Sequence, residues 1–229
     1  MNRFGAINNE ACSLLDSAEY GTAVGLFKEA LTVLQTEISG SDSNHELFSE
    51  RTKLCVPRIQ NSSTSFFFHQ QTEHFGPWIY AQPLRISPDE SDVSNSHVFA
   101  VTFNMALACH LLATEFEDDS VGNYARQYFY KAKKLYQLPL KLIQESTSNF
   151  TSLMEEDLFL FAAVLNNISH VHSSLEEIEC MMVYRHQLVK TLFFFIDAGV
   201  ISHDRTFAFD CFLVNVQDLV CRIYTAGAA

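Results

Sequence analysis

The sequence has few of the residues that interrupt helices. Of its 229 residues, 8 are glycine and 5 are proline, while 48% are hydrophobic. β-Sandwiches and β-barrels need frequent turns, which these two residues commonly form, so their scarcity disfavours an all-β fold. A chain of this length fits one domain or a short helical array. We therefore expect a mainly α fold.

Basic residues are scarce as well. The chain has 15 Lys and Arg against 27 Asp and Glu, which gives a formal net charge of −12. Nucleic acids and anionic membranes bind proteins through basic surfaces. Both are therefore disfavoured as partners, whereas neutral or basic partners are compatible with this charge.

Long hydrophobic runs are also missing. The longest dense apolar stretch covers residues 158–165, well short of the roughly 18 to 20 residues that span a bilayer. Residues 1–15 lack the basic region and apolar core of a secretory signal. We therefore expect no membrane span and a cytoplasmic or nuclear location. The 6 cysteines form no C-x-x-C motif, and we expect buried, reduced thiols.

Motifs of catalysis and of cofactor binding are not found. The sequence contains no Gly-rich phosphate loop, no G-x-S-x-G and no H-E-x-x-H. His170 and His172 are two positions apart, which on a helix points them about 200° apart and not at one metal ion. We therefore expect no enzyme activity, no cofactor and no metal. An enzyme with an unrecognised site is the remote alternative.

The sequence does contain helical periodicity. Between residues 20 and 34, apolar side chains recur at the spacing of one helix face. Comparable patterns predict a single domain of residues 1–229 with about seven helices. They form helix pairs at 5–39, 97–144 and 152–197 and a capping helix at 204–224. Pro139 is expected to kink or end the second helix of the middle pair.

Residues 45–96 differ in character and predict a strand-containing insertion. Residues 64–70 (TSFFFHQ) and 78–86 (WIYAQPLRI) are rich in aromatic and β-branched residues, with a Gly-Pro between them. They predict a β-hairpin-like insertion near 62–87, with Pro83 at an edge, where no hydrogen bond needs to be donated. Whether the insertion extends a binding groove or folds over it and blocks it stays open.

Two sequence patterns recur among the predicted helices. In two of the predicted helix pairs, the second helix has a small–aromatic–small pattern. The alanines let a neighbouring helix approach closely, and the ring fills the gap between them. The members of this pattern are Ala23, Phe27 and Ala30, and then Ala125, Phe129 and Ala132. Each first helix has an asparagine two positions before a small residue. These asparagines are Asn9, Asn104 and Asn167.

These patterns resemble the tetratricopeptide repeat, a helix–turn–helix unit of 34 residues. The first pair matches the family pattern throughout, at Ala11, Tyr20, Ala23, Phe27 and Ala30. The second pair matches with a longer turn. The third departs from it in its second helix, at Met181, Arg185 and Leu188. The segments FNMALACHLL, NNISHVH and FLVNV are also similar to those of uncharacterised diatom tetratricopeptide-like proteins, which implies a fold and no activity.

The resemblance implies antiparallel helix pairs in a right-handed solenoid, in which neighbouring pairs complete each other's core. It also implies a non-enzymatic scaffold or adaptor that binds a peptide or helix of a partner protein in a groove formed by the first helices. The groove residues it suggests are Asn8, Phe103, His110, Asn166 and His170. The neighbouring asparagines Asn9, Asn104 and Asn167 are expected to bond between helices instead. The alternative is a structural subunit of a larger complex that uses the hairpin and the last helix.

Overall fold

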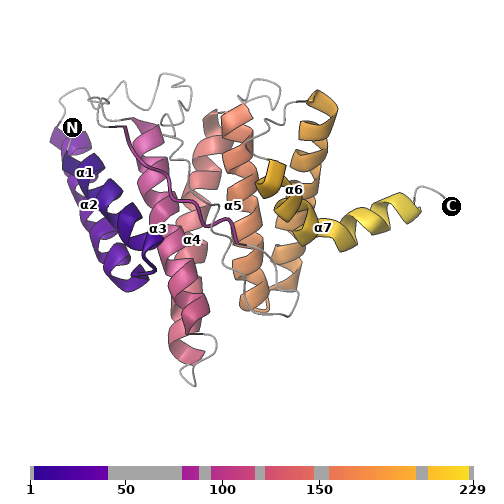
Figure 1. Cartoon of the computed structure of the whole chain (residues 1–229), viewed down its shortest axis with the longest axis horizontal. Helices are drawn as coiled ribbons and strands as arrows, with labels where there is room; N and C mark the ends of the chain where they lie inside the picture. The colour runs from indigo at the N-terminus through magenta and orange to yellow at the C-terminus, as the bar shows by residue number, and fades with distance from the viewer. Residues whose placement is uncertain are drawn as a thin grey trace. The chain divides into compact units, whose positions relative to one another are not determined.

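The computed structural model describes residues 3–40, 79–87, 94–116, 122–146, 155–199 and 206–226. Within these ranges the chain has seven α-helices and no strand (Figure 1), which confirms a mainly α fold. The helices belong to two compact units. They are α1 (Arg3–Asp16), α2 (Tyr20–Gly40), α3 (Asn95–Glu115), α4 (Gly122–Ser146), α5 (Glu155–Ser174), α6 (Ile178–Ala198) and α7 (Thr206–Ala226).

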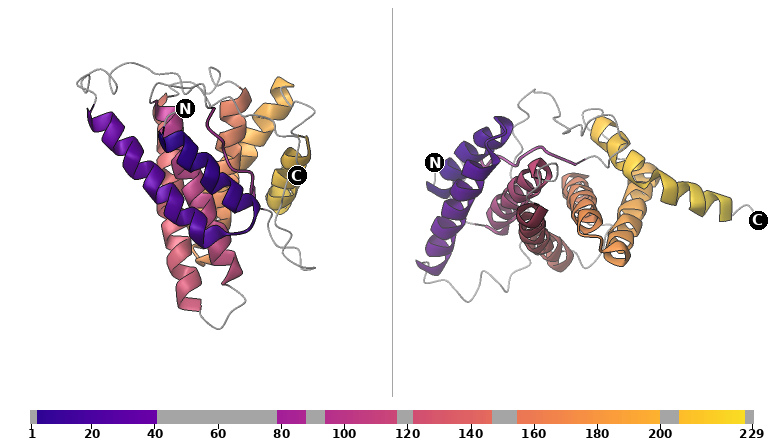
Figure 2. Two further views of the ribbon diagram at one scale, coloured as in Figure 1. Left: turned by 60° about the vertical axis from the view of Figure 1, so that its left-hand side comes forward. Right: turned by 90° about the horizontal axis from the view of Figure 1, so that it is seen from below.

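The first unit covers residues 1–64 and 83–152. Its helices pack in chain order, α1 on α2, α2 on α3 and α3 on α4, and α1 also contacts α3. Figure 2 shows α1 and α2 lying side by side. The central helix, α3, is buried along nearly its whole length, so it forms the core of this unit.

Burial also explains the apolar composition of α3. Among the described residues it is the one helix long and apolar enough to cross a membrane, and 89% of the apolar window lies inside the protein. Length and composition are weak indications of a span, because the core helix of a globular domain has the same two properties.

The small–aromatic–small pattern is confirmed as core. Phe27 is fully buried and Phe129 is 2% exposed, and the alanines of both triplets are at most 3% exposed. Burying one phenylalanine contributes about 1.5–3 kcal/mol. The two rings therefore stabilise the helix packing substantially in this unit.

Helix α4 does not end at Pro139. It continues to Ser146, although proline removes one helical hydrogen bond and crowds the preceding turn. Leu140 and Ile143 follow the proline and are both buried. Their burial offsets part of the local cost, because it holds the end of α4 against the core.

The second unit covers residues 65–82 and 153–229. Helix α6 packs against α5 and α7, and α7 also contacts α5. Arg185 on α6 donates to the main-chain oxygen of Asn215, and its Nη2 lies 2.6 Å from Asp218 Oδ1. The arginine thus binds α7 at the position where the repeat pattern expects an aromatic residue.

The turns α1–α2 and α5–α6 have the same geometry. Each is three residues long with a left-handed central residue, Ala18 (φ 60°) and Glu176 (φ 62°). The following residue donates to a carbonyl five positions back, Glu19 to Leu14 and Glu177 to His172, at 2.9 Å in both turns. This is the Schellman arrangement that ends many helices. The two helix pairs therefore have equivalent turns, whose left-handed residues, Ala18 and Glu176, are 158 positions apart in the sequence.

Candidate functional site

Each of the two units has its own candidate site, and both sites are formed on one extended segment of the chain, residues 79–87. It contains most of the second predicted strand, but it pairs with no strand among the described residues. The other predicted strand, 64–70, and Trp78 lie outside the described residues. Residues 79–82 belong to the second unit and 83–87 to the first. Side-chain amides take the place of a neighbouring strand.

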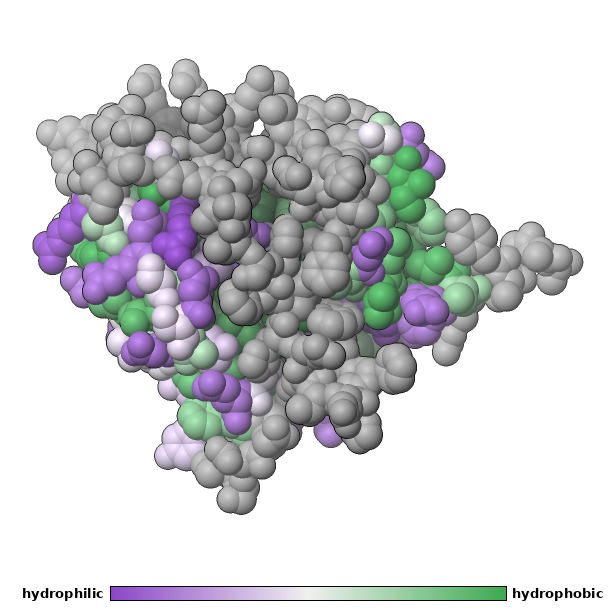
Figure 3. Space-filling view, viewed as in Figure 1, coloured by the Kyte–Doolittle hydropathy of each residue, from purple (hydrophilic) through white to green (hydrophobic). Residues whose placement is uncertain are grey.

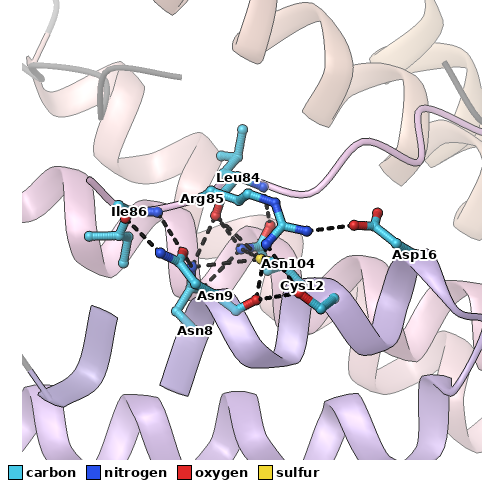
Figure 4. A network of polar contacts seen from close by, with 9 residues as sticks. Asn8, Asn9, Cys12, Asp16, Leu84, Arg85, Ile86 and Asn104 are labelled. Atoms are coloured by element: carbon cyan, nitrogen blue, oxygen red, sulfur yellow. Dashed lines mark hydrogen bonds and ion pairs between the residues drawn. The ribbon is translucent and has the colours of Figure 1, made fainter. Parts of the chain in front are cut away.

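Asn104 on α3 holds the main chain of Leu84 (Figure 4). Its Oδ1 accepts from the Leu84 N–H and its Nδ2 donates to the Leu84 carbonyl, both at 2.7 Å. Paired residues of antiparallel strands exchange the same two bonds. A carboxamide can replace a strand residue because it carries one acceptor and one donor group side by side. We call an asparagine that makes both bonds an asparagine clamp.

A second asparagine clamp lies on α1. Asn9 Oδ1 accepts from the Ile86 N–H at 2.8 Å, and Asn9 Nδ2 donates to the Ile86 carbonyl at 2.7 Å. Alternate residues of an extended chain present their main-chain groups to the same side, so Leu84 and Ile86 suit two successive clamps. Pro83 has no N–H to donate, but it falls on the other set of residues, where no clamp needs one.

The second unit has a clamp of the same kind on α5. Asn167 Oδ1 accepts from the Tyr80 N–H and Asn167 Nδ2 donates to the Tyr80 carbonyl, both at 2.8 Å. The Tyr80 ring packs against Phe159 of α5 and Phe212 of α7, at centroid distances of 5.6 and 6.0 Å. Side-chain packing therefore adds to the main-chain bonds in this unit.

The residue before two of the clamps orients the clamping amide. Asn8 Nδ2 donates to Asn9 Oδ1 at 3.2 Å, and Asn166 Nδ2 donates to Asn167 Oδ1 at 3.1 Å. Because each clamping oxygen accepts from its neighbour, its amide is held with Oδ1 toward the segment's N–H. The Asn-Asn dipeptide therefore acts alike in both units.

One charged side chain adds to the clamps in the first unit. Arg85 points to α1, where its Nη2 lies 2.5 Å from Asp16 Oδ2. Its Nη1 donates to the Asn9 carbonyl at 3.1 Å and to Ser13 Oγ at 3.3 Å. The Arg85 and Asp16 side chains are 28% and 46% exposed, so water and salt screen the ion pair in part.

Cys12 lies beneath the extended segment. Its thiol is fully buried and points at the Leu84 carbonyl, 3.6 Å away, and Asn104 Nδ2 lies 3.4 Å from the sulfur. Burial raises the pKa of the Cys12 thiol to about 12. The nucleophilic thiolate is therefore nearly absent at neutral pH.

The five groove residues expected from the sequence lie in different surroundings. Asn8 is at the extended segment, where its Nδ2 donates to the Leu84 carbonyl at 3.1 Å. Phe103 and His110 are buried in the interface of α3 with α4, where both rings contact Tyr136. They do not line an open groove, because α4 covers them.

The two expected groove residues of the second unit are both buried. Asn166 Oδ1 accepts from Asn215 Nδ2 of α7 at 2.5 Å, so it joins α5 to α7. His170 is buried, and the loss of solvation lowers the pKa of its imidazole to about 4. It is therefore neutral at physiological pH.

The asparagines expected to bond between helices hold the extended segment instead. Asn104 does also donate to Asn8 Oδ1 at 3.0 Å, which is a bond from α3 to α1. Yet all three, Asn9, Asn104 and Asn167, form clamps. The sequence signal for these clamps was the recurrence of an asparagine at the same position in the first helix of each predicted pair. The sequence pattern did not show that residues 79–87 lie beside them.

The described residues hold no group of three or more His, Cys, Asp or Glu side chains that could bind a metal ion. Comparisons with protein-family models, with curated proteins and with solved structures find no match to this chain. The site is therefore interpreted from its own geometry and chemistry.

Proposed function

We propose that this chain is a non-enzymatic adaptor that binds an extended segment of a partner protein at its asparagine clamps. The observation that carries the proposal is that Asn104 and Asn9 bind the main chain of alternate residues, Leu84 and Ile86, through both N–H and C=O. Clamps of this kind accept many sequences, because every residue except proline has both groups.

An extended ligand fits the clamps better than a helical one. In a helix, the N–H and C=O of one residue point in opposite directions along the axis and bond within the helix. In an extended chain both groups face the same side and are free to pair with a neighbour. Of the two ligands that the tetratricopeptide resemblance implies, a peptide or a helix, we therefore propose the peptide.

We further propose that the helix pairs are tetratricopeptide-like units of a right-handed solenoid. The matching turns at Ala18 and Glu176 support this proposal. So does the burial of the small residues Ala11, Ala106 and Ser169, which occupy the same position of the three first helices. A repeat of this kind places one clamp on each first helix.

A partner segment must compete with the chain's own extended segment. That segment is continuous with residues of the same chain, so its effective concentration at the clamps is in the millimolar range or higher. A free peptide therefore binds weakly to the unaltered chain. Weakening the intramolecular bonds should raise the apparent affinity for an added peptide.

The test uses a fluorescent nine-residue peptide, IYAQPLRIS, with the sequence of residues 79–87, and the full-length chain. Asn9→Asp keeps the shape of the half-buried side chain and loses the donor to the main-chain carbonyl. Asn123→Asp, on the exposed face of α4, is the matched control. On the control chain, fluorescence anisotropy should detect the labelled peptide as it exchanges with the chain's own extended segment at the clamps.

For the Asn9→Asp chain, two clamp contacts change together, the one to the internal segment and the one to the peptide. We therefore expect the peptide to dissociate at least about fivefold faster from this chain than from the control. The reason is that the carboxylate at position 9 cannot donate a hydrogen bond to the main-chain carbonyl of the bound peptide. Equal dissociation rates from the two chains would contradict binding at the clamps. Circular dichroism establishes that both chains are folded.

A structural subunit of a larger complex is the second candidate. In the second unit, hydrophobic residues gather over α6 and α7 on the face shown in Figure 3. Where burial is described, the exposed large apolar residues of these helices are Ile178, Val183, Ile196 and Val214. Tyr80, which lies in the predicted hairpin segment, is buried and cannot contribute to such a surface. Analytical ultracentrifugation of the purified chain with and without Val214→Asp tests whether α7 mediates self-assembly.

A further inference from the structure

We propose that the partner segment preferred by the clamps of α1 and α3 has an aliphatic–arginine–aliphatic sequence, with the arginine bound by Asp16. This inference rests on the proposed function and names its ligand. It follows from how Leu84, Arg85 and Ile86 sit on α1 and α3.

The arginine is bound by three acceptors on consecutive turns of α1. They are the main-chain oxygen of Asn9, the hydroxyl of Ser13 and the carboxylate of Asp16, at 3.1, 3.3 and 2.5 Å. Both terminal nitrogens of the guanidinium take part (Figure 4). A planar fork with several donors can satisfy three separated acceptors, whereas a lysine ammonium acts as a point charge. The arrangement therefore favours arginine.

The flanking positions favour aliphatic residues. Leu84 and Ile86 are 1% and 2% exposed, while Pro83, Arg85 and Ser87 are half-buried. This is the alternation of an extended chain with one face against a protein surface. The hydrogen bonds from α1 and α3 reach the main chain of Leu84 and Ile86. A polar side chain at either buried position would therefore lose its hydration without gaining a hydrogen bond from the clamps.

The charge of the protein favours the same ligand. The chain has 12 more acidic than basic residues by formal charge, so a basic segment is attracted and an acidic one is repelled. The Asp16 side chain is 46% exposed, so the preference for arginine should be moderate and sensitive to salt.

The experiment uses two full-length variants that each repel their own extended segment. Arg85→Glu leaves Asp16 at the site, and Asp16→Arg makes the site basic. Each is titrated with two labelled peptides that differ at one position, IYAQPLRIS and IYAQPLEIS. We expect the Arg85→Glu chain to prefer the arginine peptide about three- to tenfold, and the Asp16→Arg chain to reverse that preference.

Two further chains control for net charge and for folding. Glu10 is exposed on the same helix as Asp16, so adding Glu10→Arg to Arg85→Glu changes the net charge as Asp16→Arg does and should preserve the preference for arginine. Arg85→Gln removes the internal ion pair without introducing repulsion. It carries the same titration if the Arg85→Glu chain does not fold.

The outcomes separate this inference from the proposed function. Equal affinities for the two peptides in both variants overturn the inference and leave the binding of extended segments standing. Failure of every variant to bind either peptide below about 1 mM, the scale set by effective concentration, overturns the proposed function as well. If the unaltered chain sediments as a dimer that added unlabelled IYAQPLRIS dissociates, the occupant is a second copy, and a partner protein is excluded as the preferred ligand.

Discussion

Asn104 and Leu84 exchange two hydrogen bonds of 2.7 Å, one in each direction, across 20 residues of sequence. Among the described residues of the first unit no strand pairs with this extended chain. A side-chain amide on a buried helix supplies the donor and the acceptor that a neighbouring strand would supply. Asn9 and Asn167 repeat the arrangement with Ile86 and Tyr80. The positions of these asparagines on their helices, and not the strand propensity of the segment, therefore determine where the segment binds.

Replacing Asn104 with aspartate should destabilise the first unit by about 2–4 kcal/mol, because the carboxylate cannot donate to the Leu84 carbonyl and would be a buried charge. Asn104 is fully buried. Chemical denaturation monitored by circular dichroism measures the change. The exposed Asn123→Asp should shift stability by less than about 0.5 kcal/mol. Equal shifts for the two variants would show that the Asn104 clamp contributes little to stability.

Cys12 should report when the extended segment leaves the clamps. Its burial beneath Leu84 and its raised pKa of about 12 make the thiol slow to react with iodoacetamide. Cys180 and Cys221 are exposed and should be labelled first. Arg85→Glu should increase the rate at Cys12 severalfold without changing the rate at Cys180, as measured by mass spectrometry of labelled peptides. A Cys12 rate that does not respond would mean that the segment stays bound without its ion pair.

The helical part of the fold followed from the sequence because it is encoded locally. Apolar periodicity around Phe27 and Phe129 marks the buried face of each helix, and both rings are core. The end of α4 did not follow, since the burial of Leu140 and Ile143 beyond Pro139 is a tertiary effect. The rule that proline ends a helix considers only the local backbone and leaves out such tertiary contacts.

The candidate site was predictable in part. The recurrence of Asn9, Asn104 and Asn167 drew attention to one position of the first helices, and these asparagines are the clamps. Their ligand did not follow from the sequence, because the pairing of Tyr80 with Asn167 spans 87 residues and no local pattern encodes it. The aromatic and β-branched residues of 78–86 indicated an extended chain. They are equally compatible with a strand in a hairpin.

Phe27→Ala should destabilise the first unit by about 3–5 kcal/mol, since removing a fully buried ring leaves a cavity between packed helices. Tyr124, on α4, is 57% exposed, and Tyr124→Ala should change stability by less than about 0.5 kcal/mol. Thermal unfolding of both variants provides the comparison. A loss below about 1 kcal/mol for Phe27→Ala would mean that the helices repack around the missing ring.

His170 should make the second unit less stable in mild acid. Burial lowers the pKa of its imidazole from 6.5 to about 4, so between these values the unfolded chain binds a proton that the folded chain does not. Stability must then rise with pH through this window, and the contribution is fully present above pH 6.5. Lowering the pH from 6.5 to 5 should remove about 1.5 kcal/mol. His170→Gln eliminates this loss, whereas His186→Gln, at an exposed position of α6, retains it. Urea denaturation at pH 5.0, 5.5, 6.0 and 6.5 separates the two variants, and identical pH slopes would show that His170 does not titrate with the predicted shift.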